Sequence, residues 1–211
     1  GLAVLDYEAL HALEPNISKN ATCALLAPTG AIVCPYELTI AAVGNAMDNG
    51  AELKLDFDVQ KIRDHGEYFE VISEEARVCA RYVINAAGLF ADAVARMIGD
   101  DSFHIHPRRG EYVLLDKTCG SIVGHTVFRT PSKMGKGILV SPTVDGNLLC
   151  GPTSVDMEDK DDHATTAEGL AHVMREAIEN VEGVAFQNSI TSFCGLRAVG
   201  SQGDFIIGMP H

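Results

Sequence analysis

Two arginines that stand close to glycines are the residues best suited to chemistry in this sequence. Arg197 is the only lysine or arginine after Arg175, and it lies between an expected strand and a loop of Gly, Ser and Gln. Arg109 precedes Gly110 at the start of a region of expected strands. A guanidinium offers a planar fork that binds a carboxylate or a phosphate through two hydrogen bonds, and loops at strand ends commonly carry binding residues. Both arginines are therefore candidates for binding an anion, and the alternative for each is an ordinary surface charge.

The run Asn-Ala-Ala-Gly at 85–88 is a second candidate site. It follows an expected buried strand and precedes an expected helix over 89–98. Strand, small residues, glycine and helix follow one another in this order in turns that bind phosphates or nucleotides. The alternative is a tight turn in which only glycine fits. The position after a buried strand favours close approach of a ligand to the backbone at Gly88.

Other patterns do not form a recognisable site. The acidic run 156–162 lacks the Gly and Glu of a calcium-binding EF-hand loop, because Asp161 and Ala167 stand there instead. Residues 133–137 lack the complete phosphate-loop pattern, so we interpret them as a hairpin turn with a basic tip that could help to attract an anion. The six cysteines form no C-x-x-C pair and no histidine spacing completes a zinc site, so no metal site is expected. No Ser/His/Asp grouping is visible, and the catalytic residues stay unassigned.

The elements that position these residues begin with helices and a β-meander. The pattern predicts a helix over 6–14 with Asp6 as its N-cap, an extended segment over 23–35 and a helix over 36–49 between Pro35 and Gly50. Four strands are then expected, with a tight turn at 64–66; they cover 52–56, 58–63, 68–73 and 77–85.

The second half of the chain is predicted to be mostly β-structure. Thr165 and Glu168 have the spacing of a capping box that starts a helix ending near Val181. The layout predicts an α/β (α+β) fold, in which a nucleotide-type α/β portion is interrupted by a mostly antiparallel sheet. Strands are expected over 104–107, 111–116, 126–129, 137–141, 147–151, 188–194 and 204–207.

Composition excludes several classes of protein. The 211 residues are 46% hydrophobic, which is too apolar for a disordered chain, and no apolar run reaches the ~18 residues of a membrane helix. The net charge of −13 argues against nucleic acid as a partner. Residues 108–136 nevertheless hold six Lys and Arg against two acids, a local +4 that suggests attraction of a small anion. Cysteines without pairing motifs and the absence of a signal peptide favour a cytoplasmic protein.

The order of these features resembles the middle of the FAD-dependent oxidoreductases of the glycerol-3-phosphate dehydrogenase and D-amino-acid oxidase superfamily. The Arg-Gly-Glu-Tyr piece and the Gly-Leu-Arg…Asp-Phe ending are also similar to the L-2-hydroxyglutarate oxidase branch. The matching pieces are TGAIVCP at 29–35, Val59, VINAAG at 83–88, RGEY at 109–112, GPT at 151–153, GLR at 195–197 and DFIIG at 204–208.

The resemblance implies a partial FAD-binding, Rossmann-like domain that carries an inserted antiparallel substrate domain. Residues 1–103 would belong to the FAD-binding domain, 104–194 would form the substrate-binding domain, and 195–211 would return to the FAD-binding domain. The G-x-G-x-x-G motif of the family has no match here. We therefore expect an excised middle piece of a longer protein, with an incomplete FAD site.

The resemblance also implies roles for particular residues. Ala87 and Gly88 would approach the phosphates or ribose of FAD, Val59 would lie near the adenine, and Gly195 would contribute to the cofactor site.

Three further residues would bind the substrate. Arg197 would bind its anionic group near the flavin, and Arg109 and Tyr112 would line its pocket. Some relatives place His where Tyr112 stands, so no catalytic base is assigned.

The expected function is oxidation of a small anionic alcohol, such as glycerol 3-phosphate, by hydride transfer to flavin in the full-length parent. One alternative is oxidation of a 2-hydroxy acid of the L-2-hydroxyglutarate type. The other is a non-catalytic binding or interaction module, and the isolated piece is expected to be inactive. The electron acceptor, the oligomeric state and any peripheral contact with a membrane stay open.

Overall fold

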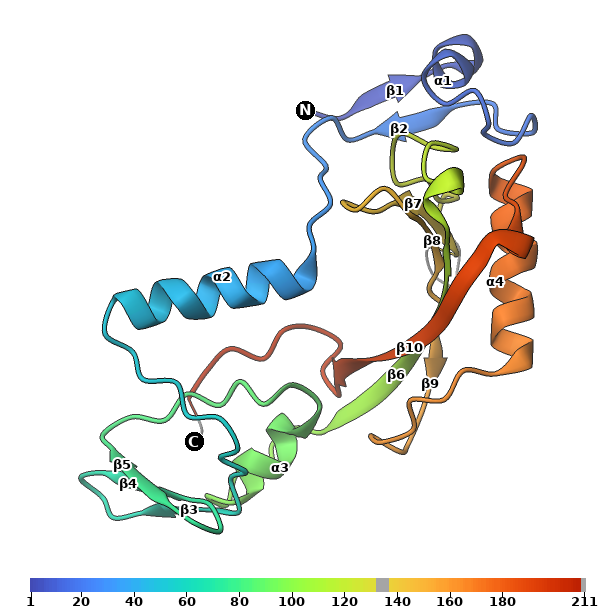
Figure 1. The fold of residues 1–211 in the computed structure, drawn as a ribbon. Helices are drawn as coiled ribbons and strands as arrows, with labels where there is room; N and C mark the ends of the chain where they lie inside the picture. The colour runs from blue at the N-terminus through green and yellow to red at the C-terminus, as the bar shows by residue number, and fades with distance from the viewer. Residues whose placement is uncertain (132–136, 210–211) are drawn as a thin grey trace. The chain divides into compact units, whose positions relative to one another are not determined.

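The computed structural model describes residues 1–131 and 137–209 and shows a mixed α/β fold built on antiparallel strand pairs (Figure 1). This confirms the fold class expected from the sequence. The chain divides into two compact units. The first unit contains Gly1–Ala42, Arg109–Val155 and His163–Gly195, and the second contains Val43–Arg108, Asp156–Asp162 and Leu196–His211.

A five-stranded sheet forms the centre of the first unit. Its strands lie in the order β10-β6-β8-β7, and β9 pairs with β6. Strands β7 and β8 form an antiparallel hairpin, and Asp145-Gly146, a dipeptide that favours hairpin turns, lies between them. The strands are β6 (Ile105–Leu115), β7 (Leu139–Pro142), β8 (Leu148–Gly151), β9 (Val155–Asp156) and β10 (Ser189–Gly200).

Helix α4 (Ala167–Asn180) covers one face of this sheet (Figure 1). Alternate residues of β6 point toward it, and two of these, Val113 and Leu115, are opposite Cys150 and Leu148 of β8. All four are essentially inaccessible to solvent. The period of two along the strand therefore decides which side chains enter the core. The core cluster comprises Val113, Leu115, Cys119, Val123, Ile138, Val140, Leu148, Cys150, Val173, Ala177, Val181 and Val184.

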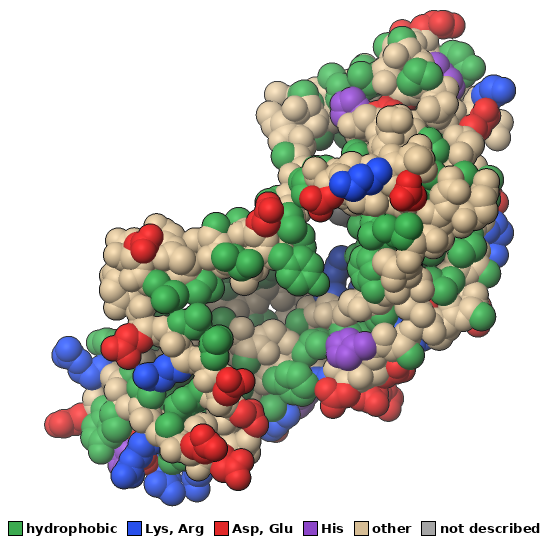
Figure 2. Space-filling view, viewed as in Figure 1, with side chains coloured by type: hydrophobic (Ala, Val, Ile, Leu, Met, Phe, Trp, Pro, Cys, Tyr) green, Lys and Arg blue, Asp and Glu red, His purple; other side chains and the backbone are tan. Residues whose placement is uncertain are grey.

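The N-terminal segment forms the predicted helix and, in addition, a strand over residues 3–5 that was not predicted. Strands β1 (Ala3–Leu5) and β2 (Ala24–Leu26) pair with each other, and helix α1 (Tyr7–Leu13) lies between them in sequence. The Asp6 carboxylate accepts a hydrogen bond from the backbone N–H of Ala9 at 2.9 Å, so Asp6 is the predicted N-cap. The predicted second helix is α2 (Pro35–Asp48), and none of its residues is buried. Figure 2 shows hydrophobic side chains exposed along it.

The second unit contains a three-stranded antiparallel meander. Its strands are β3 (Lys61–Asp64), β4 (Phe69–Ile72) and β5 (Arg77–Ala80), in the order in which they follow one another in the chain. Glu70 lies on the central strand and accepts hydrogen bonds from Arg63 and Arg77. Burial raises the pKa of its carboxyl, but the two guanidinium groups outweigh burial and leave the pKa below its usual range.

Several expected strands differ in the structure. Residues 52–56 and 204–207 form no strand, and β5 ends at Ala80 rather than at residue 85. Their apolar side chains are exposed, as Leu55 and Ile207 show. A strand needs a neighbour for its backbone groups, and the described residues supply none for these segments. Residues 126–129 contribute only a bridge between Val127 and Val140.

The start of α4 is also shifted by one residue. Thr166, not Thr165, is its N-cap and accepts a hydrogen bond from the N–H of Gly169 at 3.0 Å. Elsewhere the expected strands 104–107 and 111–116 merge into the long strand β6. The expected strand 188–194 continues as β10 to Gly200, through residues that were expected to form a loop. None of the helices in the described part of the chain is long and apolar enough to cross a membrane.

Candidate functional site

A buried carboxylate, Glu111, fixes strand β6 against the N-terminus of α4. Its side chain accepts hydrogen bonds from the backbone N–H and the hydroxyl of Thr166 and from the hydroxyl of Thr153. Glu111 is only 1% exposed. A negative charge at this end of a helix is favoured by the helix dipole. The Glu111 carboxylate comes this close to α4 because residue 169 is a glycine. A Cβ built at Gly169 would lie 1.8 Å from Oε2 of Glu111.

The structure places the predicted substrate residues Arg109 and Tyr112 on opposite faces of β6. Arg109 lines a cavity of about 370 Å³ together with Glu111 and residues of α4 that include His172. The Tyr112 ring lies on the other face and stacks on Phe193 of β10, with ring centroids 5.1 Å apart. The two predicted pocket residues are therefore not brought together.

Glycine at position 151 makes room for Tyr112. Gly151 has a φ of +138°, and a Cβ there would lie 2.7 Å from the Tyr112 ring. Both the backbone conformation and the space thus require glycine. The placement of the Tyr112 ring on the face away from α4 depends on it.

Gly195 and Arg197 both lie within strand β10, rather than at its junction with a loop. They are two residues apart and so lie on the same side of the strand. Both are exposed. Apart from its chain neighbours, no atom of the described residues lies within 4 Å of a Cβ built at Gly195. The Arg197 side chain is accessible to an anion from solvent.

The run 85–88 forms a turn that Asn85 holds from both sides. The Asn85 side chain accepts a hydrogen bond from the N–H of Ala87 at 3.2 Å and donates one to the carbonyl of Ala91 at 2.7 Å. Gly88 starts a short 3₁₀ segment, η1 (Gly88–Phe90), which leads into α3 (Ala91–Arg96). Its φ of +56° favours glycine, and the space around a Cβ there is open. The backbone at Ala87 and Gly88 is therefore accessible to a ligand.

Lys160, whose ammonium group supports this turn, was not identified from the sequence. Lys160 donates hydrogen bonds to the carbonyl of Leu89 at 2.6 Å and to the Asp92 carboxylate at 2.7 Å. Burial alone would raise the pKa of the Asp92 carboxyl. Lys160, the N–H of Ile105 and the nearby Arg96 outweigh burial and lower the pKa to about 2. The only signal in the sequence is a single lysine within the acidic run 156–162.

The basic stretch 108–136 is less positive in the structure than in the sequence. Arg108 pairs with Asp156 at 2.6 Å, which raises the pKa of Arg108 and lowers that of Asp156. Arg129 pairs with Glu179 at 2.7 Å and with Glu176 at 3.4 Å. Residues 132–136, with two of the lysines, lie outside the described residues. Acids from later in the chain thus neutralise part of the charge that suggested attraction of an anion.

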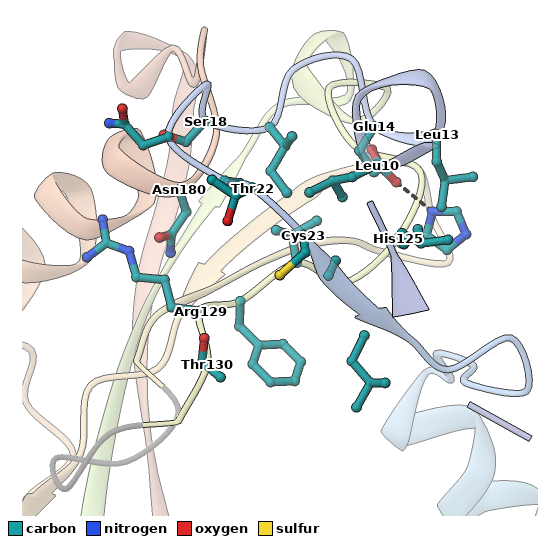
Figure 3. A pocket seen from close by; sticks show the side chains of 18 of the residues that line it. Leu10, Leu13, Glu14, Ser18, Thr22, Cys23, His125, Arg129, Thr130 and Asn180 are labelled. Atoms are coloured by element: carbon teal, nitrogen blue, oxygen red, sulfur yellow. Dashed lines mark hydrogen bonds and ion pairs between the residues drawn. The ribbon is translucent and has the colours of Figure 1, made fainter. Parts of the chain in front are cut away.

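A cavity in the first unit contains none of the predicted site residues. It has a volume of about 1000 Å³ and is lined by the N-terminal segment, by residues 125–131 and by the end of α4 (Figure 3). Figure 3 shows the Glu14 carboxylate and the His125 ring directed toward each other. Glu14 is buried and also accepts hydrogen bonds from the N–H of Gly124 at 3.0 Å. Its charge is thus satisfied by groups of the cavity wall.

The described cysteines are all free, and their environments differ. Cys119 and Cys150 are buried in the core, whereas Cys23 and Cys79 are exposed. Burial raises the pKa of the Cys150 thiol to about 12. Cys150 therefore behaves as a small hydrophobic residue, whereas the thiol of Cys79 is open to solvent.

Comparison with known proteins assigns the family. The model of the DAO family, described as FAD dependent oxidoreductase, matches residues 1–211. The chain belongs to this family. This confirms the resemblance seen in the sequence, including the FAD cofactor that is characteristic of the family.

Individual members of the FAD dependent oxidoreductase family are similar over the whole chain. Glycerol 3-phosphate dehydrogenase of Caloramator mitchellensis is 43% identical over 206 residues, which are 98% of this chain and 43% of that protein. Glycerol 3-phosphate oxidase of Mycoplasma pneumoniae is 27% identical over 216 residues, covering all of this chain and 56% of that protein. The chain thus spans about half the length of the curated relatives it matches.

A solved structure shows the same fold. The dithionite-reduced L-alpha-glycerophosphate oxidase of Mycoplasma pneumoniae with FAD bound superposes with a TM-score of 0.91 at 26% identity. The match covers 100% of this chain and 56% of that chain. The mixed α/β model is therefore a portion of the FAD-dependent oxidoreductase fold.

The residues present fit part of an FAD site. The accessible backbone at Ala87 and Gly88, with open space where a Cβ would stand, suits close approach of a phosphate or ribose. Val59 is half-buried just before β3, as suits a contact with an apolar ring. The G-x-G-x-x-G motif of dinucleotide-binding turns is absent from residues 1–211.

Proposed function

We propose that this chain forms part of an FAD-dependent dehydrogenase that oxidises a small anionic alcohol, with glycerol 3-phosphate as its substrate. The observation that carries the proposal is the 43% identity, over 98% of the chain, to a glycerol 3-phosphate dehydrogenase. In this proposal the remainder of the FAD site comes from polypeptide outside residues 1–211. Residues 1–103 and 195–211 belong to the FAD-binding domain, and residues 104–194 form the substrate-binding domain.

The cofactor residues in the proposal are Val59, Ala87, Gly88 and Gly195. FAD, when bound, supplies the hydride acceptor for oxidation of the alcohol. The chain itself supplies shape and accessible backbone. Gly88 lets the ligand approach its backbone because it carries no side chain, and Val59 offers an apolar contact.

The substrate residue that the geometry favours most is Arg197. Its exposed guanidinium can bind a phosphate or carboxylate bidentately. Tyr112 is the better supported of the other two candidates, because its ring lies on the sheet face that α4 leaves open. Arg109 lies on the α4 side, so a role in the pocket would require a substrate that reaches the cavity beside Glu111.

Flavin reduction in the full-length protein tests the proposal. The oxidised protein is mixed anaerobically with glycerol 3-phosphate, glycerol or L-2-hydroxyglutarate, and loss of the flavin absorbance is followed. We expect rapid bleaching by glycerol 3-phosphate and little by glycerol, which lacks the anionic group. Absence of bleaching by each of these alcohols would refute the proposal. Exposing the reduced protein to oxygen and following return of the flavin absorbance tests whether oxygen can be the electron acceptor.

A second candidate function is oxidation of a 2-hydroxy acid. The L-2-hydroxyglutarate dehydrogenase of Mus musculus is 24% identical over 170 residues, which are 74% of this chain. Faster flavin reduction by L-2-hydroxyglutarate than by glycerol 3-phosphate would select this alternative.

The isolated chain and its location are part of the same proposal. Purified residues 1–211 should be colourless and inactive, because part of the FAD site is missing. A yellow, stoichiometric FAD complex of residues 1–211 would show that the site is complete. The free thiols of the described cysteines suit a reducing compartment, and we place the protein in the cytoplasm.

A further inference from the structure

The acidic segment 156–162 contains one lysine, and that side chain is largely buried. Lys160 is 19% exposed, although Asp and Glu occupy five of the other six positions in the segment. Its ammonium group donates to the Leu89 carbonyl at 2.6 Å and to Oδ1 of Asp92 at 2.7 Å. It also lies 5.6 Å from the centre of the Phe90 ring. A buried ammonium with three such partners fixes the segments it joins.

Asp92 has a second cation, but only Lys160 reaches the turn. Arg96 donates to Oδ2 of Asp92 at 3.3 Å from the next turn of the same helix, and the N–H of Ile105 donates to the same oxygen. Among the described residues, neither group donates a hydrogen bond to the backbone before residue 90. Lys160 bonds to the carbonyl of Leu89, the residue directly after Gly88.

The backbone at Gly88 needs such support. It has a φ of +56° and is exposed. The Asn85 side chain bonds to Ala87 before Gly88 and to Ala91 after it. Lys160 adds a bond to Leu89, directly after Gly88, from a segment 71 residues later in the chain. Together they hold the turn in one conformation before any ligand arrives.

We propose that Lys160 is a positioning residue for the cofactor, and that it preorganises the Ala87–Gly88 turn for FAD through the Leu89 carbonyl. This inference rests on the proposed function, in which Ala87 and Gly88 contact FAD. A turn that is already ordered loses less conformational freedom when the ligand binds, so the affinity is higher. Lys160 acts through the backbone and need not touch the cofactor.

The test compares three variants of the full-length protein. Lys160→Met removes the ammonium, Lys160→Arg keeps the charge, and Arg96→Met is the matched control because it removes the other cation of Asp92. The measurements are the FAD dissociation constant of the apoprotein, from flavin fluorescence, and the unfolding midpoint of the apoprotein. Lys160→Met should weaken FAD binding about tenfold, as expected for loss of a charge-assisted hydrogen bond. Lys160→Arg should recover part of the affinity.

The control separates positioning from stability. Arg96→Met should leave the FAD dissociation constant within about twofold of wild type, because its ion pair is half exposed. FAD binding by Lys160→Met as tight as wild type would overturn the inference. Weakening by both variants in proportion to their loss of stability would also overturn it. Failure of the wild-type protein to bind FAD would overturn the proposed function, and this role of Lys160 with it.

Discussion

The carboxylate of Glu111 occupies the volume that any side chain at position 169 would require. Thr166 and Thr153 hold that carboxylate in place, and a Cβ at residue 169 would lie 1.8 Å from Oε2. A strand and a helix are thus joined at one point by a buried acid and a glycine. This junction fixes the strand that carries Arg109 and Tyr112.

Gly169→Ala should destabilise the protein by about 2 kcal/mol, because the new methyl group overpacks the site and displaces the Glu111 carboxylate. Chemical denaturation followed by circular dichroism measures the loss. Gly44→Ala on α2 is the control, since space there is open and alanine favours a helix. Equal stability of Gly169→Ala and wild type would show that Glu111 can move freely.

Acid should weaken the second unit through Asp92. Its folded pKa of about 2 lies below the ordinary value of 3.8, so the folded state favours the ionised carboxylate. The resulting stabilisation of about 2 kcal/mol is fully present above about pH 4 and is lost as the pH falls through 2. Denaturation midpoints measured between pH 5 and pH 2, in the range where the native state persists, should fall more steeply for wild type than for Asp92→Asn. Parallel curves would contradict this role of Asp92.

The cysteines should react with a thiol reagent in two classes. Cys23 and Cys79 are exposed and should be modified quickly in the native protein at pH 8. Cys150 should react only after denaturation, because burial raises its pKa to about 12 and shields the sulfur. Peptide mapping by mass spectrometry after timed alkylation identifies each site. Rapid labelling of Cys150 in the native state would show that the core opens.

Arg197→Ala in the full-length protein should raise KM for an anionic substrate about tenfold or more, since a charge-assisted contact is worth about 1.5–3 kcal/mol. Arg175→Ala provides the control, because Arg175 is exposed on α4 and lies near His172 and Glu176. Unchanged kinetics in Arg197→Ala would assign this arginine to the surface. A neutral substrate should be affected much less than an anionic one.

Local signals predicted much of the fold. Some signals depend on only a few neighbouring residues, and the structure has the corresponding elements in place. They are the Asp6 cap, Pro35 at the start of α2 and the Asp145-Gly146 turn. The order of short motifs also pointed to the correct family. Strand partners are not local, however, and residues 52–56 were expected to pair although the described residues offer no neighbour.

The candidate site was harder to predict, because its supports come from distant parts of the chain. Glu111 binds Thr166, 55 residues away, and Thr166 rather than Thr165 is the N-cap of α4. Lys160 binds Asp92, 68 residues away, and the residues around one do not indicate that it pairs with the other. The roles of Arg197 and Tyr112 remain predictions, although the structure leaves both available for them.

Helix α2 has a consequence for the cooperativity of folding. None of its 14 residues is buried and only Val43 and Gly44 are half-buried, so tertiary packing within the described residues adds little to its stability. An isolated helix of about this length is marginal in water. In the chain described here, α2 can therefore fray and reform without disturbing the core, and its amide protons would exchange with solvent long before those of α4.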